Sequence, residues 1–353
     1  MAVYTTIDDP SAHFKVQLYA GTGSSQSITF NDTDTNMQPD LVWIKNRDDA
    51  DNHGVFDSVR GTQKHLKADT NDPEATRTDA LSAFDSDGFS FNGSNAVVNT
   101  SSEDYVAWCW KGGGSASANS VGSIASSVSA NTTSGFGIAT YTGSGSADTV
   151  GHGIGIVPQV VFAKRRDSTS HWMTYHHSLG NANELYLNQT SATSSAANTW
   201  NSTTPTTTVS SVKNDANNTS TGTFVNYLFA PVQGFSKFGT YKGTGSAANL
   251  GPFIYLGFRP ALVITKPKTE ADAWSLWDNK RPGYNNLQHQ LFAHASSAES
   301  AGASTKSITF CANGFKIDGS DAGELNNSGD TFVYLAWAEA PFVNSEGVPC
   351  NAR

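Results

Sequence analysis

The sequence is poor in charge and in cysteine, and each shortage excludes a class of protein. Charged residues make up 15% of its 353 residues, and the net charge is −9 at pH 7. A protein that binds nucleic acid or an anionic membrane surface needs a basic face, so this balance argues against both partners. The three cysteines, Cys109, Cys311 and Cys350, show neither a disulfide framework nor metal-ligand spacing.

Long apolar runs and a secretion signal are also missing. No stretch approaches the roughly 20 apolar residues that a membrane-spanning helix requires. Residues 1–10 lack the basic and apolar regions of a signal peptide. We therefore expect a protein without membrane insertion that is synthesised in a cytoplasm.

Glycine and aromatic residues are plentiful instead. The chain has 32 glycines, 8 tryptophans, 11 tyrosines and 19 phenylalanines. Short runs of β-branched and aromatic residues lie between clusters of Gly, Asn and Asp, which is typical of a many-stranded protein. The composition predicts an all-β fold.

A string of the form Tyr-x-Gly-Thr/Ser-Gly-Ser occurs three times, at residues 19–24, 141–146 and 241–246. Each copy is followed by a Pro-led apolar run that ends in lysine, and later by an aromatic strand that closes the unit. The runs are residues 39–45, 158–164 and 260–266, and the closing strands are residues 105–110, 224–230 and 332–338. Three copies at near-domain spacing indicate an internal repeat.

The repeats predict three tandem β-sandwiches of a jelly-roll or lectin-like kind. We assign residues 1–111 to an N-terminal arm and the first sandwich, 135–232 to the second, and 233–353 to the third with a C-terminal tail. The Gly/Ser-rich tract at 112–134 has the composition of a flexible linker. Residues 1–13 are polar and are expected to form an extended arm.

The three Tyr-led strings could each form a phosphate-binding loop or a tight β-turn. None continues as a dinucleotide-binding or Walker motif, so the turn is favoured. The chain also lacks a Gly-x-Ser-x-Gly nucleophile elbow and the Glu-x-Asp-x-x-Glu strand of sandwich glucanases. These absences predict that the protein is not an enzyme.

Two aspartates are candidate ligands of a metal ion. Asp85 and Asp87 alternate on one predicted strand, and paired carboxylates of this kind can hold Ca²⁺. The alternative is that both simply flank the turn at Gly88. A second acidic loop at residues 48–51 has the same two readings. His171, His176 and His177 lie close in sequence, but we interpret His176 as a polar residue at a strand end.

The tryptophans divide into core and ligand candidates. Trp108 and Trp337 are interpreted as repeat-equivalent residues of the closing strands and are predicted to be buried. Trp172 and Trp200 have no equivalent in the other repeats. They are therefore the candidates for stacking on a sugar ring.

The Tyr-led string, the Pro-x-Leu-Val run and the Tyr-Val-Ala-Trp closing strand together resemble a family of tandem-repeat domains without an assigned role. That family occurs in virion proteins of tailed bacteriophages, especially marine podoviruses, and residues 4–12 and 341–353 fit the same pattern. It is similar to concanavalin-A-like sandwiches. The resemblance implies binding rather than catalysis and supplies no catalytic residues.

We therefore expect a bacteriophage virion protein, a tail-associated appendage or fibre subunit involved in host-surface attachment. The alternative is a capsid decoration or head-fibre protein with a purely structural role. A polysaccharide-degrading enzyme is the weakest of the three hypotheses. The expected partners are other virion proteins, further copies of the chain in a homo-oligomer, and a glycan or protein of the host surface. No cofactor is expected apart from the candidate Ca²⁺.

Overall fold

The computed structural model describes residues 4–30, 35–195, 198–213, 215–246, 250–281, 285–300, 305–320 and 322–350. In these ranges every pair of named strands is antiparallel, so the all-β prediction is confirmed. Among the described residues, helical structure is confined to the short turns η1 (Pro10–Ala12), η2 (His177–Leu179), α1 (Asp215–Asn218) and η3 (Ala322–Asn326). No helix of the described ranges is long and apolar enough to cross a membrane.

Three sheets, which we call the central sheets, have the same strand order, one in each sequence repeat. The Tyr-led string follows the first strand in sequence, the Pro-led run supplies the third strand, and the closing strand lies between them. In order across the sheet, the strands are β1 (Phe14–Ala20), β9 (Asp104–Trp110), β3 (Leu41–Asn46) and β4 (Gly54–Asp57); β12 (Phe136–Thr142), β19 (Thr223–Phe229), β14 (Val160–Arg165) and β15 (Met173–His176); and β20 (Ser236–Lys242), β27 (Thr331–Pro341), β22 (Phe258–Pro267) and β23 (Ser275–Asp278).

A smaller sheet, the outer sheet, belongs to each repeat. Its strands are β2 (Gln26–Thr29), β8 (Gly88–Phe91) and β7 (Leu81–Asp85) in the first repeat, β13 (Asp148–Gly151) and β18 (Val209–Val212) in the second, and β21 (Phe253–Tyr255), β26 (Gly314–Ile317) and β25 (Ile308–Cys311) in the third. In the first repeat, Ile28 and Phe89 of the outer sheet share a core cluster with Val42 and Ile44 of the central sheet. Two layers with apolar side chains between them are a common way to bury a sheet.

Further strands extend the second and third central sheets, and β5 (Lys64–His65) and β6 (Ala75–Thr76) pair with each other in a separate sheet. The strands that extend the central sheets are β10 (Ser117–Asn119), β11 (Ser126–Asn131), β16 (Asn183–Tyr186), β17 (Ser194–Ser195) and β24 (Leu291–Phe292). β10 and β11 pair beside β12 in the second central sheet. The prediction of a flexible linker at 112–134 is therefore wrong for these strands. A strand is held by its backbone hydrogen bonds, so a Ser-rich composition does not exclude it.

Each Tyr-led string forms the same turn, held by an asparagine that precedes the closing strand. In the first repeat, Asn99 Oδ1 accepts the N–H of Thr22 at 2.9 Å, and the Tyr19 hydroxyl donates to the carbonyl of Val98 at 2.8 Å. A Cβ on Gly21 would lie only 2.1 Å from a backbone carbonyl oxygen, so the turn requires glycine there. The asparagines of the other two turns are Asn218 and Asn326. These contacts support the β-turn reading of the strings.

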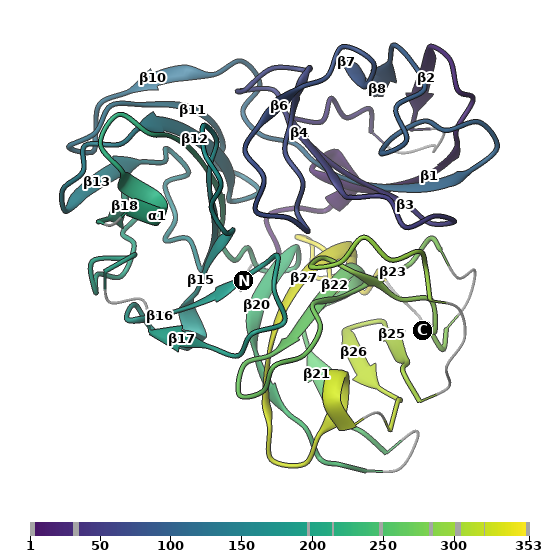
Figure 1. Ribbon diagram of the computed structural model, residues 1–353. Coiled ribbons are helices and arrows are strands. Elements are labelled where there is room, and N and C mark those ends of the chain that lie inside the picture. Colours follow the sequence, from purple (N-terminus) through teal and green to yellow (C-terminus); the bar gives the residue numbers. More distant parts are fainter. Residues whose placement is uncertain are drawn as a thin grey trace.

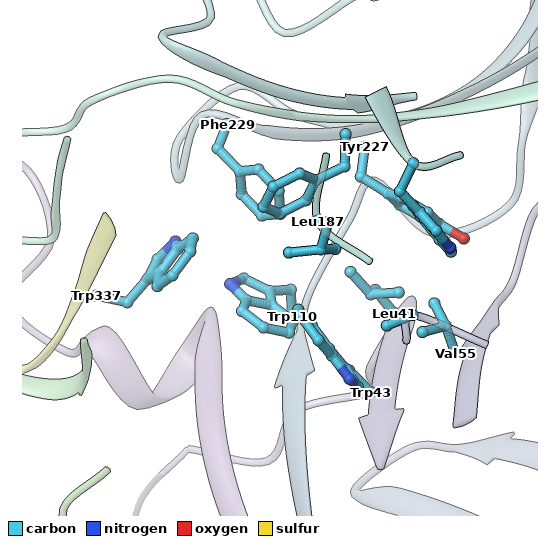
Figure 2. A pocket seen from close by; sticks show the side chains of 11 residues that line it. Leu41, Trp43, Val55, Trp110, Leu187, Tyr227, Phe229 and Trp337 are labelled. Carbon is cyan, nitrogen blue, oxygen red and sulfur yellow. The ribbon is translucent and has the colours of Figure 1, made fainter. Parts of the chain in front are cut away.

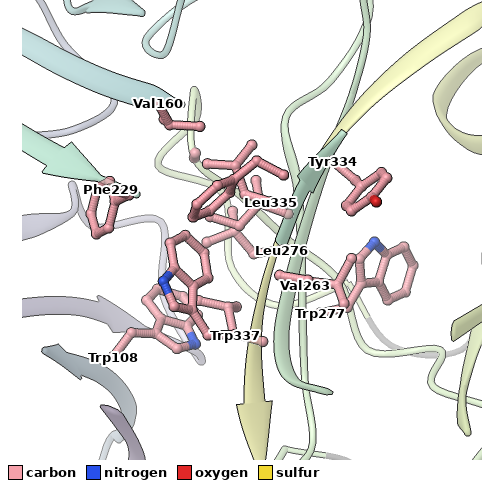
Figure 3. Packing of buried hydrophobic residues seen from close by; sticks show 14 of the residues in the cluster. Trp108, Val160, Phe229, Val263, Leu276, Trp277, Tyr334, Leu335 and Trp337 are labelled. Atoms are coloured by element: carbon pink, nitrogen blue, oxygen red, sulfur yellow. The ribbon is translucent and has the colours of Figure 1, made fainter. Parts of the chain in front are cut away.

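The three central sheets surround one common core (Figure 1). Trp110, Phe229 and Trp337, one from each closing strand, meet edge to face, with ring centroids 5.9, 5.3 and 5.3 Å apart. Figure 3 shows Phe229 and Trp337 within this packing. Edge-to-face contact is a favourable geometry for aromatic rings. The repeats are thus joined through a shared core rather than strung out along the chain.

The register of the closing strands corrects one predicted equivalence. Trp110 pairs with Phe14, five residues before Tyr19, and Trp337 pairs with Ser236, five residues before Tyr241. Trp337 is therefore the counterpart of Trp110, and not of Trp108 as the sequence comparison had it. The predicted burial of Trp108 and Trp337 is confirmed, at 0% and 2% exposure.

A buried ion-pair network joins the first repeat to the second. Arg60 binds Asp57 and also Glu74, at 3.0 Å. Glu74 in turn accepts from Arg166 of the second repeat at 2.9 Å, and the Tyr227 hydroxyl donates to Asp57 at 2.6 Å. Each buried charge thus has a charged partner, as buried ions require.

The third repeat is joined to the first in the same way. Arg281 binds Asp278 at 2.7 Å and Glu299 at 3.1 Å. Glu299 accepts from Arg47 of the first repeat at 3.0 Å, and the Trp108 indole donates to Asp278 at 3.2 Å. Each residue of this network occupies the same place as its counterpart in the network between the first two repeats.

The junction between the second and third repeats keeps the geometry, but its described residues form no such buried ion-pair network. His176 stands where Asp57 and Asp278 stand, and its Nε2–H donates to the carbonyl of Tyr334 at 3.4 Å. The Thr193 hydroxyl donates to the carbonyl of Lys268 at 2.8 Å. The three junctions together close a ring of repeats within one chain.

The N-terminal residues do not form a free arm in the described part of the chain. Ile7 is buried in the common core, and the Thr5 hydroxyl donates to the carbonyl of Gln233 at 2.9 Å. Asp8 accepts the N–H of Ser345 at 2.7 Å. The prediction of an extended arm at 1–13 is therefore wrong for these residues, because Ile7 supplies apolar surface that the core buries.

Candidate functional site

A cleft of about 370 Å³ lies where Tyr4 and residues 342–343 meet the connection between the second and third repeats. It is the candidate binding site because its walls carry exposed aromatic rings. Its lining residues are Tyr4, Pro231, Val232, Gln233, Gly234, Ser236, Lys237, Tyr255, Leu256, Gly257, Phe342 and Val343.

Two tyrosines and a lysine give the cleft its chemical character. Tyr4 is 49% exposed and Tyr255 is 56% exposed, although most aromatic side chains of the described residues are buried. The ammonium of Lys237 lies 5.3 Å from the centroid of the Tyr255 ring and donates to the Tyr255 carbonyl at 2.8 Å. Partial burial lowers the pKa of Lys237. The lysine thus lies over the Tyr255 ring at the edge of the cleft.

The walls of the cleft are held by backbone contacts. Gly234 has a φ of +79°, and a Cβ there would lie 2.6 Å from the Thr5 side chain, so glycine allows the N-terminal segment to pack against this turn. Gly257, with a φ of +88°, accepts the N–H of Phe342 at 3.1 Å. The walls are therefore preformed, as is usual for a small-ligand site.

The described residues of the lining supply aromatic rings, an amide, hydroxyls and an ammonium, but no carboxylate, histidine or cysteine. General acid–base or nucleophilic catalysis needs one of these side chains or an activated hydroxyl or lysine. Aromatic faces flanked by a few hydrogen-bonding groups suit the binding of a ligand with both apolar and hydroxyl surfaces. A sugar has such surfaces.

The two predicted stacking tryptophans lie elsewhere and are buried, each at 2% exposure. The Trp172 indole donates to the carbonyl of Lys67 in the first repeat at 2.8 Å. Trp200 packs edge to face with Tyr175, at 5.7 Å between ring centroids. Neither indole presents a face to a ligand. The strand register also shows that Trp172 has an equivalent, Trp274, whose indole donates to the carbonyl of Tyr186 in the second repeat at 2.9 Å, so the prediction that it has none is wrong.

The candidate metal ligands Asp85 and Asp87 have protein partners. Asp85 accepts the hydroxyl of Ser90 at 2.5 Å, and Asp87 accepts the N–H of Met37 at 3.1 Å. In the ranges that the structure describes, no cluster of three or more His, Cys, Asp or Glu side chains could hold a metal ion. This arrangement supports the alternative in which the aspartates belong to the turn.

The acidic loop at 48–51 and the histidines also make contacts within the chain. Asp48 accepts the N–H of Asp104 at 2.7 Å, and Asp51 accepts the side chain of Asn46 at 2.8 Å. His177 bonds the carbonyl of Phe238 at 3.1 Å. These groups stabilise loops and the ring of repeats.

A second, enclosed space of about 20 Å³ lies inside the common core, and Figure 2 shows its lining. Trp43, Trp110, Tyr227 and Phe229 are among the side chains around it. A small cavity lined by apolar groups stays empty in proteins, so this space is a packing defect rather than a ligand site.

The fold and the cleft define an all-β protein in which three like sheets enclose one core and a preformed cleft opens beside the connection between the second and third repeats. Residues 9–341 match the family described as a domain of unknown function, DUF7483, and the chain belongs to that family. A single domain of this family spans all three repeats. No curated protein and no solved structure matches the chain.

The cleft tyrosines were not among the predicted site residues. A signal for Tyr255 is present in the sequence, since residues 253–255 read Phe-Ile-Tyr where the first repeat has Ser27-Ile28-Thr29. Alternation places the isoleucines on the buried face and the flanking residues outside. Aromatic residues at the outward positions therefore mark an unusual surface.

Proposed function

We propose that this chain is a non-enzymatic structural protein of a tailed-bacteriophage particle, in a tail-associated appendage or fibre that attaches to the host surface. The observation that carries this proposal is the cleft in which Tyr4 and Tyr255 expose their rings beside Lys237. The motif resemblance described above supports the assignment to a particle. In this proposal the repeats are lectin-like sandwiches, and the cleft binds a glycan of the host surface.

Binding at one such cleft is expected to be weak, and a particle compensates by presenting many copies. Linked weak sites gain avidity through effective concentration. The proposed homo-oligomer would form through the outer surfaces of the ring, because the junction surfaces are already paired within the chain.

Capsid decoration is the second candidate function. The observation that favours it is the rounded arrangement of the three repeats, without an elongated shaft among the described residues (Figure 1). Cryo-electron microscopy of the particle distinguishes the two, because density at the tail supports the first candidate and density on the capsid supports the second.

Removal of the open ring is predicted to weaken glycan binding without unfolding the protein. We expect Tyr255→Ala to raise the dissociation constant about tenfold, the effect of losing roughly 1.4 kcal/mol of contact energy. The measurement is binding to an immobilised panel of bacterial surface polysaccharides, followed by titration of the best binder. Thermal unfolding should be unchanged, because the side chain is 56% exposed.

Val121→Ala is the matched control, because Val121 is 63% exposed and lies outside the cleft. It should bind like the unaltered protein. Equal binding by Tyr255→Ala and Val121→Ala would remove the cleft from the proposal. Measurable turnover of a bound polysaccharide would overturn the non-enzymatic assignment.

A further inference from the structure

We propose that the free edge of β21 in the third repeat binds an extended segment of another protein, which adds to the outer sheet as a parallel strand. This interaction is separate from glycan binding, although Tyr255 contributes to both surfaces. The corresponding outer-sheet edge differs among the three repeats. The segment that covers it in the second repeat indicates what kind of segment binds in the third.

The equivalent edge of the second repeat is covered by the chain itself. Ile124 forms a parallel bridge with Val150 of β13, and its N–H donates to the carbonyl of Thr149 at 2.9 Å. The Ser126 hydroxyl donates to the carbonyl of Gly151 at 2.9 Å. Ile124 is 8% exposed in this position and joins a core cluster with Val150. An extended, hydroxyl-rich segment with one β-branched residue thus fits this edge.

Strand register shows that the edges correspond. Each first strand of an outer sheet has one buried apolar residue that pairs with the neighbouring strand. These pairs are Ile28 with Phe89, Val150 with Ser210, and Ile254 with Phe315. No strand or bridge of the described residues occupies the free edge of β2 or β21.

The side chains beside the open edges differ between the first and third repeats. The first repeat places the exposed polar residues Ser27 and Thr29 there. The third repeat places Phe253 and Tyr255 there, exposed by 48% and 56%. An open edge with large apolar side chains invites pairing with another chain, which proteins usually prevent. Retention of two aromatic rings at this edge fits a surface that a partner covers.

The backbone of β21 offers the groups that a parallel strand needs. Phe253 occupies the position of Thr149, so its carbonyl is the acceptor for an N–H of the added strand. Lys237 already donates to the carbonyl of Tyr255 at 2.8 Å, which leaves the pairing centred on Phe253 and Ile254. Side chains of the added strand would pack against the two rings as cross-strand neighbours. The partner is therefore an extended segment with hydroxyl and β-branched residues.

A peptide copy of residues 122–127 is the probe, because Ser123, Ile124 and Ser126 make the equivalent contacts with β13 in the second repeat. We expect the peptide, added to the full chain, to slow amide hydrogen exchange of residues 252–256 and to leave residues 26–29 unchanged. A peptide with proline in place of Ile124 lacks the bonding N–H and should give no slowing. No slowing at residues 252–256 with the first peptide, or equal slowing with the second, would overturn the proposal.

The two repeats supply matched variants. The double change Phe253→Ser and Tyr255→Thr gives the third repeat the side chains of the first, and it should weaken the peptide effect at least tenfold. The converse change, Ser27→Phe with Thr29→Tyr, should create slowing at residues 26–29. Tyr4→Ala alters only the glycan cleft and should leave the peptide effect intact, whereas Phe253→Ser alone should spare glycan binding. Protection of residues 252–256 that grows with protein concentration in the absence of peptide would assign the edge to a second copy and contradict the proposal.

Discussion

Trp337→Ala is expected to destabilise the whole protein rather than the third repeat alone. Trp337 is 2% exposed and contacts Trp110 of the first repeat and Phe229 of the second. Emptying a buried site of this size costs about 3–5 kcal/mol of unfolding free energy. Because the lost contacts belong to all three repeats, we expect one cooperative transition at a lower denaturant concentration. Urea unfolding followed by circular dichroism and by tryptophan fluorescence measures this.

Trp337→Phe is the control, since phenylalanine is the residue that the second repeat carries at this position. It keeps an aromatic ring in the cluster, so it should lose less unfolding free energy than Trp337→Ala does. A separate early transition of the third repeat, with the first two repeats as stable as before, would show that the repeats fold independently. The shared core would then have no energetic role.

The repeats and their strands could be predicted from the sequence because both depend on local signals. The Tyr-led string needs glycine where Gly21 approaches a carbonyl, and the strand before it places Phe14 and Val16 in the common core and Tyr19 in the core under the outer sheet. These requirements recur in each repeat, so the sequence repeats them too. The turn, the order of elements and the all-β class therefore followed from the residues.

The closure of the repeats into a ring could not be predicted in the same way. Two junctions use Asp57 and Asp278, while the third uses His176 in the same place. A carboxylate and an imidazole do not look equivalent in a sequence, although both accept from backbone N–H groups here. Which repeat a side chain reaches depends on the arrangement of whole sheets, and no local pattern records it.

The candidate site was missed for a related reason. Burial of an aromatic residue depends on which face of a strand it occupies and on what covers that face. Trp172 and Trp200 were singled out as lacking repeat equivalents, yet Trp172 corresponds to the buried Trp274 of the third repeat and Trp200 packs in the core of the second. Tyr4 reaches the cleft only because the N-terminal segment packs against the connection at residues 231–234.

Acid is predicted to destabilise this protein as the pH falls from 6.5 to about 4.5, before most carboxylates are protonated. The pKa of His176 is lowered to about 3, mainly by burial and also by His177 and Lys268. Burial also lowers the pKa of His53 and of His65 to about 4. These imidazoles stay neutral in the folded protein, whereas the unfolded chain takes up protons near pH 6.5.

The sign of the effect follows from this difference. Below pH 6.5 the unfolded state binds more protons than the folded state, so the free energy of unfolding falls as the pH falls. Each of the three histidines contributes a loss on the order of 3–5 kcal/mol by the time the pH reaches its folded pKa. Burial alone would raise the pKa of Glu299, but Arg47, Arg281 and His289 hold it at about 2. Its stabilising contribution is therefore present above pH 4.5 and is lost between pH 4.5 and 2.

Urea unfolding at a series of pH values from 7.5 to 4 tests the prediction, and His176→Asn isolates one group. Asparagine does not titrate, and like the aspartates of the other junctions it can accept the backbone N–H that His176 accepts from Ser178. Below pH 6 the variant should lose about 1.4 kcal/mol less per pH unit than the unaltered protein, the slope of one proton. Stability that stays constant from pH 7 to 4.5, or identical slopes for the two proteins, would show that His176 is not held neutral at the junction between the second and third repeats.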